Sequence, residues 1–142
     1  MLSDPPPIYA LSIKQPWAAL VVMGLKTVEI RRWPTSRRGR ILIHAARVPD
    51  KRGESEAPTS TRFKELAQLR GGIIGSVELI DCTAYRDPAL FGADKDLHYN
   101  DATWFEPPVL YGFRFVKPEV LTFHAYPGWF RFFKVDGLAH AS

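Results

Sequence analysis

The apolar residues of this chain are grouped in short segments that Pro, Gly and charged residues interrupt. Two segments have helical spacing, one from Pro16 to Met23 and one over residues 61–69. Six or seven segments have the alternation typical of strands. They are residues 8–13, 27–33, 40–46, 73–80, 109–116, 120–124 and 129–135. Because strands carry most of the apolar residues, the pattern predicts an α+β fold, a small mixed β-barrel of six or seven strands with two short helices.

The length of 142 residues is sufficient for one domain with a single core. We expect residues 1–7 to be a flexible tail, residues 8–136 to form the domain, and residues 137–142 to be a frayed end. The acidic stretch 81–108 has little periodicity, which predicts a long surface excursion with one helical turn near Ala89.

The sequence has no apolar run long enough to cross a bilayer, and its first residues do not form a signal peptide. A single cysteine, Cys82, excludes an internal disulfide and a cysteine-based zinc site. His98, His124 and His140 are not spaced as metal ligands. We therefore expect no membrane association, no metal, no cofactor and a cytoplasmic location.

Charge is distributed unevenly along the chain. Residues 31–52 carry one acidic residue, Asp50, and eight basic ones: Arg31, Arg32, Arg37, Arg38, Arg40, Arg47, Lys51 and Arg52. The charged residues between positions 81 and 106 are mostly acidic. A basic segment of this kind favours a surface that attracts phosphate groups, and the alternative is a pair of solvated loops of opposite charge.

Residues 24–33 combine an ammonium, a carboxylate, a guanidinium and an indole directly after the first predicted helix. In a strand, alternate side chains lie on opposite faces, so Val28 and Ile30 would share the buried face. The other face would carry Thr27, Glu29, Arg31 and Trp33. A charged face beside an aromatic ring suits a flat ligand that forms hydrogen bonds. The alternative is a Glu–Arg pair on a solvated strand, which contributes little to stability.

Three motifs resemble the ASCH domain, a member of the PUA-like superfamily. The first runs from Leu11 to Ala18 and contains Ser-x-x-Gln-Pro-Trp, and the second is Gly24-x-Lys-Thr-x-Glu-x-Arg31. The third spans Gly39 to Ala45, and residues 72–79 with the Trp129-Phe130 pair extend the resemblance over about residues 9–135.

The resemblance implies a PUA-like β-barrel with a cleft between the first helix and the barrel, where RNA or a modified nucleobase would bind. Trp17 or Trp33 would stack on a base, although Trp17 also suits a core position. Glu29 would accept hydrogen bonds from an exocyclic amine, and Arg31 would donate to a carbonyl or phosphate. The residues expected to contact the ligand are Ser12, Lys14, Gln15, Trp17, Lys26, Glu29, Arg31, Trp33, Arg37, Arg38 and Arg40.

Three alternatives remain open at this point. Some ASCH proteins are amidohydrolases that act on N4-acetylcytidine, and Lys26 matches their lysine, but Glu29 replaces their threonine and Glu106 is one candidate for their glutamate. A ribonuclease could use Lys26 and Glu29 with His44 as general acid or base. A protein-interaction module of coactivator type would need an exposed apolar patch, for which we consider Trp104, Phe105 and Tyr111.

Overall fold

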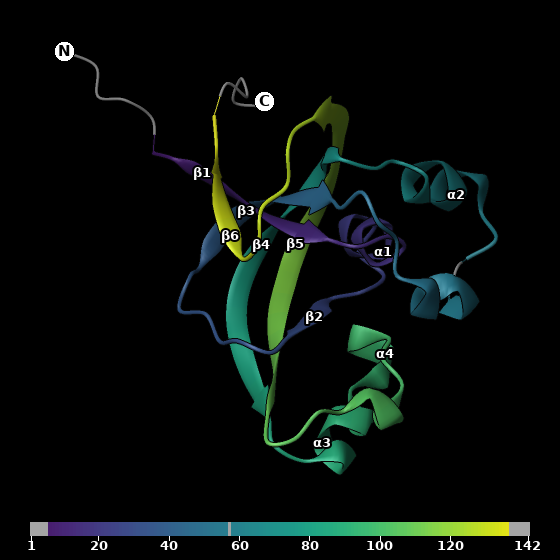
Figure 1. Cartoon of the computed structure of the whole chain (residues 1–142), viewed down its shortest axis with the longest axis vertical. Coiled ribbons are helices and arrows are strands. Elements are labelled where there is room, and N and C mark those ends of the chain that lie inside the picture. The colour runs from purple at the N-terminus through teal and green to yellow at the C-terminus, as the bar shows by residue number, and fades with distance from the viewer. Residues whose placement is uncertain (1–5, 57, 137–142) are drawn as a thin grey trace.

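A computed structural model describes residues 6–56 and 58–136 of the chain (Figure 1). The strands are β1 (Ile8–Ile13), β2 (Val28–Arg31), β3 (Gly39–Ala45), β4 (Gly72–Tyr85), β5 (Leu110–Ala125) and β6 (Phe132–Val135). The α-helices are α1 (Trp17–Val22), α2 (Thr61–Ala67), α3 (Pro88–Ala93) and α4 (Lys95–His98), and the 3₁₀ helices are η1 (Lys51–Glu56) and η2 (Ala102–Trp104).

The six strands form one curled sheet in the order β2-β5-β4-β3-β1-β6. β1 and β3 are parallel and the other neighbouring strands are antiparallel, so the sheet is mixed, as the sequence predicts. Figure 1 shows β4 and β5 as two long, bent arrows, with α3 and α4 gathered at one end of them. The predicted α+β fold with a barrel-like sheet is confirmed.

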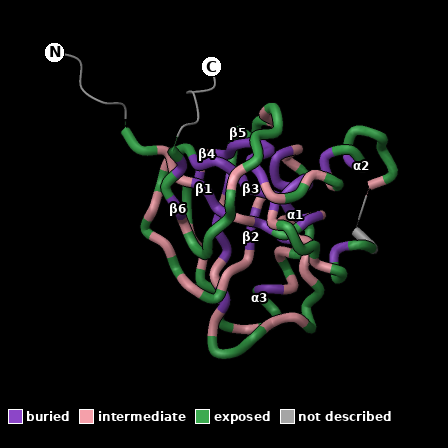
Figure 2. Tube along the Cα trace, turned by 45° about the horizontal axis from the view of Figure 1, so that its top comes forward, coloured by how far each residue is buried: buried purple, intermediate pink, exposed green. Residues whose placement is uncertain are grey.

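Helix α1 lies at the centre of the core. All six of its residues are buried, and it packs against β3, β4, β5 and α2. Gly24 has a φ of +79° directly after the helix and lets the chain turn into β2. On β4, a Cβ at Gly75 would lie 2.4 Å from Val22 Cγ1, so only glycine permits this approach of sheet and helix. Figure 2 shows the buried residues concentrated in α1 and the strands.

The two edges of the sheet meet through aromatic rings. Trp33, just after β2, lies edge-on to Phe113 of β5 and Phe132 of β6, with centroid separations of 5.1 and 5.6 Å. The Arg37 guanidinium lies 3.9 Å from the centroid of the Tyr9 ring in β1. Ring packing therefore closes the side of the sheet between β2 and β6, which are not hydrogen-bonded to each other.

Several predicted boundaries are wrong. Residues 109–116 and 120–124 belong to one strand, β5, because Lys117 at φ +51° bends the chain without ending the pairing with β4. β4 continues to Tyr85, into the predicted excursion, since β5 supplies a partner along its whole length. Only residues 132–135 of the last predicted strand are extended in the sheet.

The stretch expected to be an excursion with one helical turn contains α3, α4 and η2, so the described residues hold more than two helices. Phe91 and His98 stack at 4.2 Å, and Tyr85 packs edge-on to both rings, which gives this insertion a small core of its own.

Residues 1–5 of the predicted tail and residues 137–142 of the predicted frayed end lie outside the described residues. Within the described ranges, no helix has the length and hydropathy needed to span a membrane.

Gln15 joins the start of α1 to the end of α2, and its truncation tests this junction. Its side chain donates to the carbonyl oxygens of Leu66 and Leu69 at 2.8 and 3.1 Å, and it accepts from the Ala19 N–H at 3.0 Å. Gln15→Ala leaves these buried groups unpaired, so we expect the free energy of unfolding to fall by about 3 kcal/mol in urea denaturation. The matched control is Lys14→Ala, which truncates the exposed neighbour, and equal stability of the two variants would contradict the role of Gln15.

Candidate functional site

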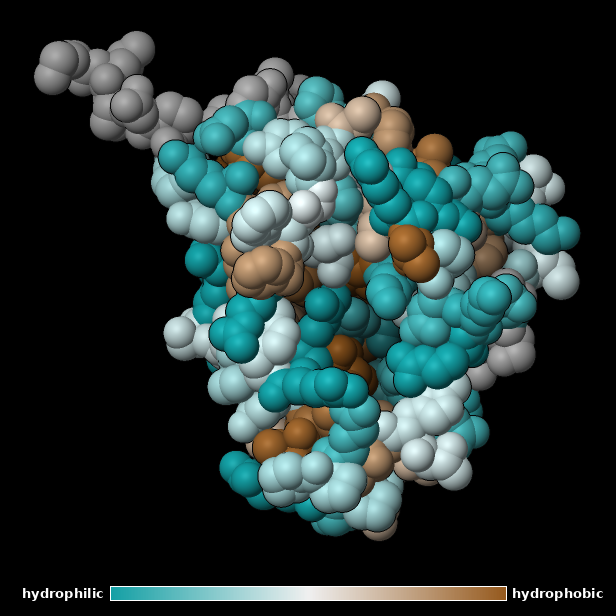
Figure 3. Space-filling model, viewed as in Figure 1, coloured by the Kyte–Doolittle hydropathy of each residue, from teal (hydrophilic) through white to brown (hydrophobic). Residues whose placement is uncertain are grey.

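A pocket of about 1110 Å³ opens on one face of the molecule, bordered by hydrophilic side chains (Figure 3). One wall comes from α1, η1 and η2, and the opposite wall comes from the segments that follow β2 and β5. The chain has four tryptophans, and all of them line this pocket: Trp17, Trp33, Trp104 and Trp129.

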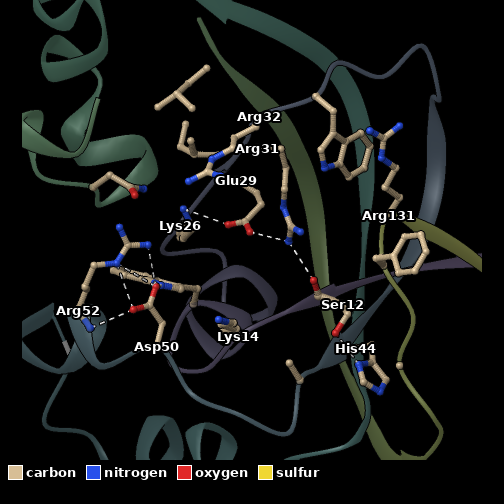
Figure 4. Close-up of a pocket in the computed structure, with 18 of the residues that line it drawn as sticks. Ser12, Lys14, Lys26, Glu29, Arg31, Arg32, His44, Asp50, Arg52 and Arg131 are labelled. Carbon is tan, nitrogen blue, oxygen red and sulfur yellow. Dashed lines mark hydrogen bonds and ion pairs between the residues drawn. The ribbon is translucent and has the colours of Figure 1, made fainter. Parts of the chain in front are cut away.

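Five polar residues form a continuous chain of hydrogen bonds and ion pairs along the floor, which Figure 4 shows as dashed lines. The links join side chains, except that Arg31 donates to the backbone carbonyl oxygen of Ser12. The order is Lys26, Glu29, Arg31, Ser12 and His44, and we call this set the polar chain. Its members come from β1, β2, β3 and the turn before β2. Residues distant in sequence therefore meet in one network at the base of the pocket.

The ammonium of Lys26 is 1% exposed and has three acceptors. Its Nζ lies 2.7 Å from the Val28 carbonyl oxygen, 2.6 Å from that of His98 and 3.3 Å from Glu29 Oε1. Burial lowers the pKa of Lys26, while Glu29 acts in the opposite direction. Three acceptors require three N–H donors, so this geometry holds the protonated amine.

Glu29 bridges two cations. Its Oε2 accepts from Arg31 Nη2 at 2.8 Å, while Oε1 faces Lys26. The same Nη2 donates to the Ser12 carbonyl oxygen at 2.9 Å. Arg31 Nε is buried and has no hydrogen-bond partner among the described residues. The side chain is 21% exposed, and its Nη1 has no protein partner among the described residues, so the guanidinium keeps donor capacity for a ligand at Nη1.

His44 and Ser12 end the polar chain. His44 Nε2–H donates to the Tyr126 carbonyl oxygen at 2.8 Å, so Nδ1 of the neutral ring accepts from the Ser12 hydroxyl at 2.9 Å. Burial lowers the pKa of His44, which favours this neutral ring at physiological pH. Ser12 therefore presents lone pairs, and no free O–H, to the pocket.

Asp50 connects two side chains of the wall beside α1 by hydrogen bonds. It accepts from the Trp17 indole N–H at 3.0 Å and from Arg52 Nη2 at 3.0 Å. Partial burial raises the pKa of Asp50, but the hydrogen bonds from Arg52 and Trp17 outweigh this effect and bring the pKa to about 2. The Arg52 guanidinium lies 4.5 Å from the Trp104 ring centroid, and Trp104 meets Trp17 edge-on at 6.4 Å. These contacts between protein groups hold the wall together.

The opposite wall carries exposed aromatic rings. Trp129 and Phe130 are 65% and 74% exposed and stack on each other at 5.4 Å with an interplanar angle of 22°. Next to them, the Arg131 guanidinium lies 5.0 Å from the centroid of Trp33.

The pocket is basic. Its rim includes one salt bridge between Arg32 and Glu106 at 2.6 Å. Lys14 and Arg47 also line the pocket, are exposed, and have no carboxylate within ion-pair distance among the residues that the structure describes. These two cations are available to an anionic ligand.

Eight of the residues predicted from sequence reach the pocket: Ser12, Lys14, Trp17, Lys26, Glu29, Arg31, Trp33 and His44. Four do not. Gln15 is buried beneath α1, and Arg37 lies over Tyr9 and Phe132. Arg38 donates to the Thr35 and Arg37 carbonyl oxygens, and Arg40 donates to that of Lys117. Local packing and backbone acceptors direct these four side chains away from the pocket, and their contact with a ligand stays a prediction.

Trp33 reaches the pocket, but it also packs between Phe113 and Phe132, so it closes the barrel as well as lining the site. Sequence reasoning missed several lining residues: Arg47, Arg52, Trp104, Trp129, Phe130 and Arg131. The signal available for the aromatic ones was the concentration of tryptophan in a 142-residue chain. The basic ones were visible only as part of the charge run.

The apolar patch considered for a protein partner is not formed. Trp104 lines the pocket, Phe105 packs on Phe91 at 5.7 Å, and Tyr111 packs against the core. Within residues 6–56 and 58–136, no three His, Cys, Asp or Glu side chains are grouped so as to hold a metal ion.

Comparison with known proteins matches the ASCH domain to residues 11–134. This chain belongs to the ASCH domain family. The ASCH domain has a PUA-like fold, and this fold is associated with RNA binding.

Among curated proteins, activating signal cointegrator 1 of Homo sapiens is 37% identical over 86 residues, which is 55% of this chain and 15% of that protein. Its counterpart in Mus musculus is 36% identical over 86 residues, with the same coverage. This ASCH domain therefore spans 15% of the length of the curated relatives that it matches.

Among solved structures, the ASCH protein of Zymomonas mobilis has a TM-score of 0.60 and 18% identity, over 82% of this chain and 72% of that one. Two mutants of the same protein each give a TM-score of 0.59 at 18% identity. At this identity the likeness shows the fold alone, and it agrees with the PUA-like fold implied by the sequence.

Two buried histidines predict how stability depends on pH. Burial lowers the pKa values of His44 and His98 below 6.5, so the unfolded chain takes up protons there before the folded protein does. The free energy of unfolding should therefore fall as the pH is lowered through 6.5 toward the depressed values, as measured by urea denaturation across a pH series. His44→Gln, which retains an N–H donor for Tyr126, should reduce this pH dependence. The matched control is His124→Gln at an exposed position, and an unchanged slope in His44→Gln would contradict the assignment.

Proposed function

We propose that this ASCH domain binds a nucleobase of RNA, or of a modified nucleotide, in the pocket between α1 and the barrel. The observation that carries the proposal is the polar chain, a fixed row of donors and acceptors at the base of a basic pocket, with the rings of Trp17, Trp33 and Trp104 beside it. A nucleobase has a flat face for the aromatic rings and an edge of alternating donors and acceptors for the floor.

The floor presents both kinds of hydrogen-bonding group. Glu29 and Ser12 offer oxygen lone pairs, and Arg31 offers the N–H donors of Nη1, which have no protein partner among the described residues. A base edge that carries an amine next to a carbonyl oxygen or ring nitrogen matches this arrangement. An apolar ligand would leave these groups unpaired, which is unfavourable in a partly desolvated site.

The charge of the pocket fits the sugar-phosphate backbone. Lys14 and Arg47 are free of carboxylates among the described residues, while Glu29, Asp50 and Glu106 are each engaged by a cation. Phosphate groups near the pocket would therefore meet unpaired cations before they meet any unpaired carboxylate.

Binding is favoured over catalysis by the state of the candidate catalytic groups. The three acceptors around Lys26 occupy all of its N–H donors, so it lacks the free lone pair that a base or nucleophile needs. Both ring nitrogens of His44 have protein partners. An amidohydrolase or ribonuclease built on these residues would first have to break the polar chain.

Removing the unpaired cations tests the phosphate contacts. Lys14→Ala and Arg47→Ala should each weaken binding of a fluorescein-labelled single-stranded RNA in fluorescence anisotropy. Each should also reduce the slope of log affinity against log salt by about 0.7, the value for one phosphate contact on a single strand. Arg86→Ala is the matched control, since it removes an exposed cation outside the pocket. Equal salt slopes in all three variants and the parent would refute the contacts.

Changing the carboxylate tests recognition of the base. Glu29→Gln keeps the shape of the side chain but replaces an acceptor oxygen with an amide, so it should lower affinity for RNA by about tenfold or more, the cost of losing one good base contact. The salt slope should stay as in the parent, because no phosphate contact is removed. A variant that keeps its melting temperature and binds like the parent would exclude Glu29 from the ligand site.

A further inference from the structure

The pair formed by Trp129 and Phe130 is the main feature of the pocket that the floor does not explain. Their rings are 65% and 74% exposed, whereas the other aromatic rings of the pocket are at least half-buried. They stack on each other at 5.4 Å, and we call them the aromatic platform. Exposing two large rings to water is unfavourable unless a partner covers them.

The platform is fixed in place by contacts to the floor. Tyr126 accepts from His44 Nε2–H at 2.8 Å, and its own N–H donates to the Gly71 carbonyl oxygen at 3.1 Å. A Cβ at Gly128 would lie 2.7 Å from His44 Cε1, so the chain packs directly on the imidazole there. On the other side, Arg131 adopts a φ of +58° and places its guanidinium over Trp33, as Figure 4 shows for Arg131 beside the pocket. The rings are therefore presented by an ordered segment.

The space available exceeds what one base needs. The pocket measures about 1110 Å³, which is above the usual ~300–1,000 Å³ of pockets for small molecules. Trp17 and Trp104 form the aromatic surface beside α1, and the platform stands on the opposite wall. This volume leaves room between the two walls for a ligand longer than a mononucleotide.

Resting on the proposed function, we infer that the ligand is a single strand of RNA, in which one base enters the floor and a neighbouring base stacks on the aromatic platform. Aromatic rings stack on every base through its π-face, so the platform binds without regard to sequence. The selective contacts lie at the floor. The substrate class is thus an oligonucleotide with an unpaired segment, and a free nucleoside fills only part of the site.

Two double variants separate ring stacking from apolar contact. W129L/F130L keeps apolar side chains but removes both rings, and W129F/F130Y keeps two rings. Both positions are exposed, so both variants should melt at the temperature of the parent. We expect W129L/F130L to lower affinity for a fluorescein-labelled single-stranded RNA about tenfold or more, the loss of one stacked base, and W129F/F130Y to restore most of it.

The second measurement is calorimetry with the mononucleotides of the same RNA. The affinity of the nucleotide that binds the parent should be the same in W129L/F130L. Equal losses for RNA and mononucleotide would place the platform inside the base pocket and overturn the inference of a strand. Unchanged RNA affinity in W129L/F130L would also overturn it, while the floor could still bind a nucleotide. If the parent binds neither RNA nor mononucleotide, the proposed function itself fails.

Light scattering tests whether a second copy of the chain, instead of RNA, covers the aromatic platform. If the parent is a dimer that becomes a monomer in W129L/F130L, and RNA affinity does not change, the platform is a contact between two copies of the chain. That result would overturn the inference as well.

Discussion

The bridge that Glu29 makes between Lys26 and Arg31 is the interaction on which the site depends. Desolvating such charges costs several kcal/mol for each ion, and good geometry with additional hydrogen bonds is needed to offset this cost. The structure supplies them from separate elements. Lys26 reaches the His98 carbonyl oxygen of the helical insertion, and Arg31 reaches the Ser12 carbonyl oxygen of β1. The bridge therefore fixes the insertion, the edge strand β2 and β1 relative to one another.

The pocket exists because the sheet closes with side chains instead of a ladder of hydrogen bonds. β2 and β6 are its two edges, and Trp33 spans them by packing on Phe113 and Phe132. Rings need more space between strands than a backbone ladder does. The floor beside this closure stays accessible, and α1 with η1 provides a second wall. Arg31, Lys14 and Arg47, whose side chains keep donors without a protein partner among the described residues, line this opening.

Much of the architecture follows from sequence patterns alone. Alternation of apolar residues located the first four strands, and Gly24 located the end of α1. The motif with Lys26, Glu29 and Arg31 pointed to the ion bridge, because strand spacing brings Glu29 and Arg31 to one face. Local signals failed where pairing with a distant strand decided the outcome, as at Lys117, where β5 bends and continues along β4. The expected cytoplasmic location stays a prediction.

The sequence by itself determined the fold class, the family and the ionic centre of the site, since these depend on residue type and short-range spacing. The tertiary structure alone decided which charges are free. Arg37, Arg38 and Arg40 belong to the same basic run as Arg31. Packing on aromatic rings and hydrogen bonds to backbone carbonyl oxygens nevertheless direct them away from the pocket. Arg47, Arg52 and the Trp129–Phe130 pair reach it from distant segments. The reason is that a side chain's partners depend on which surfaces the folded backbone brings within a few ångströms, and that distance is not encoded in local spacing.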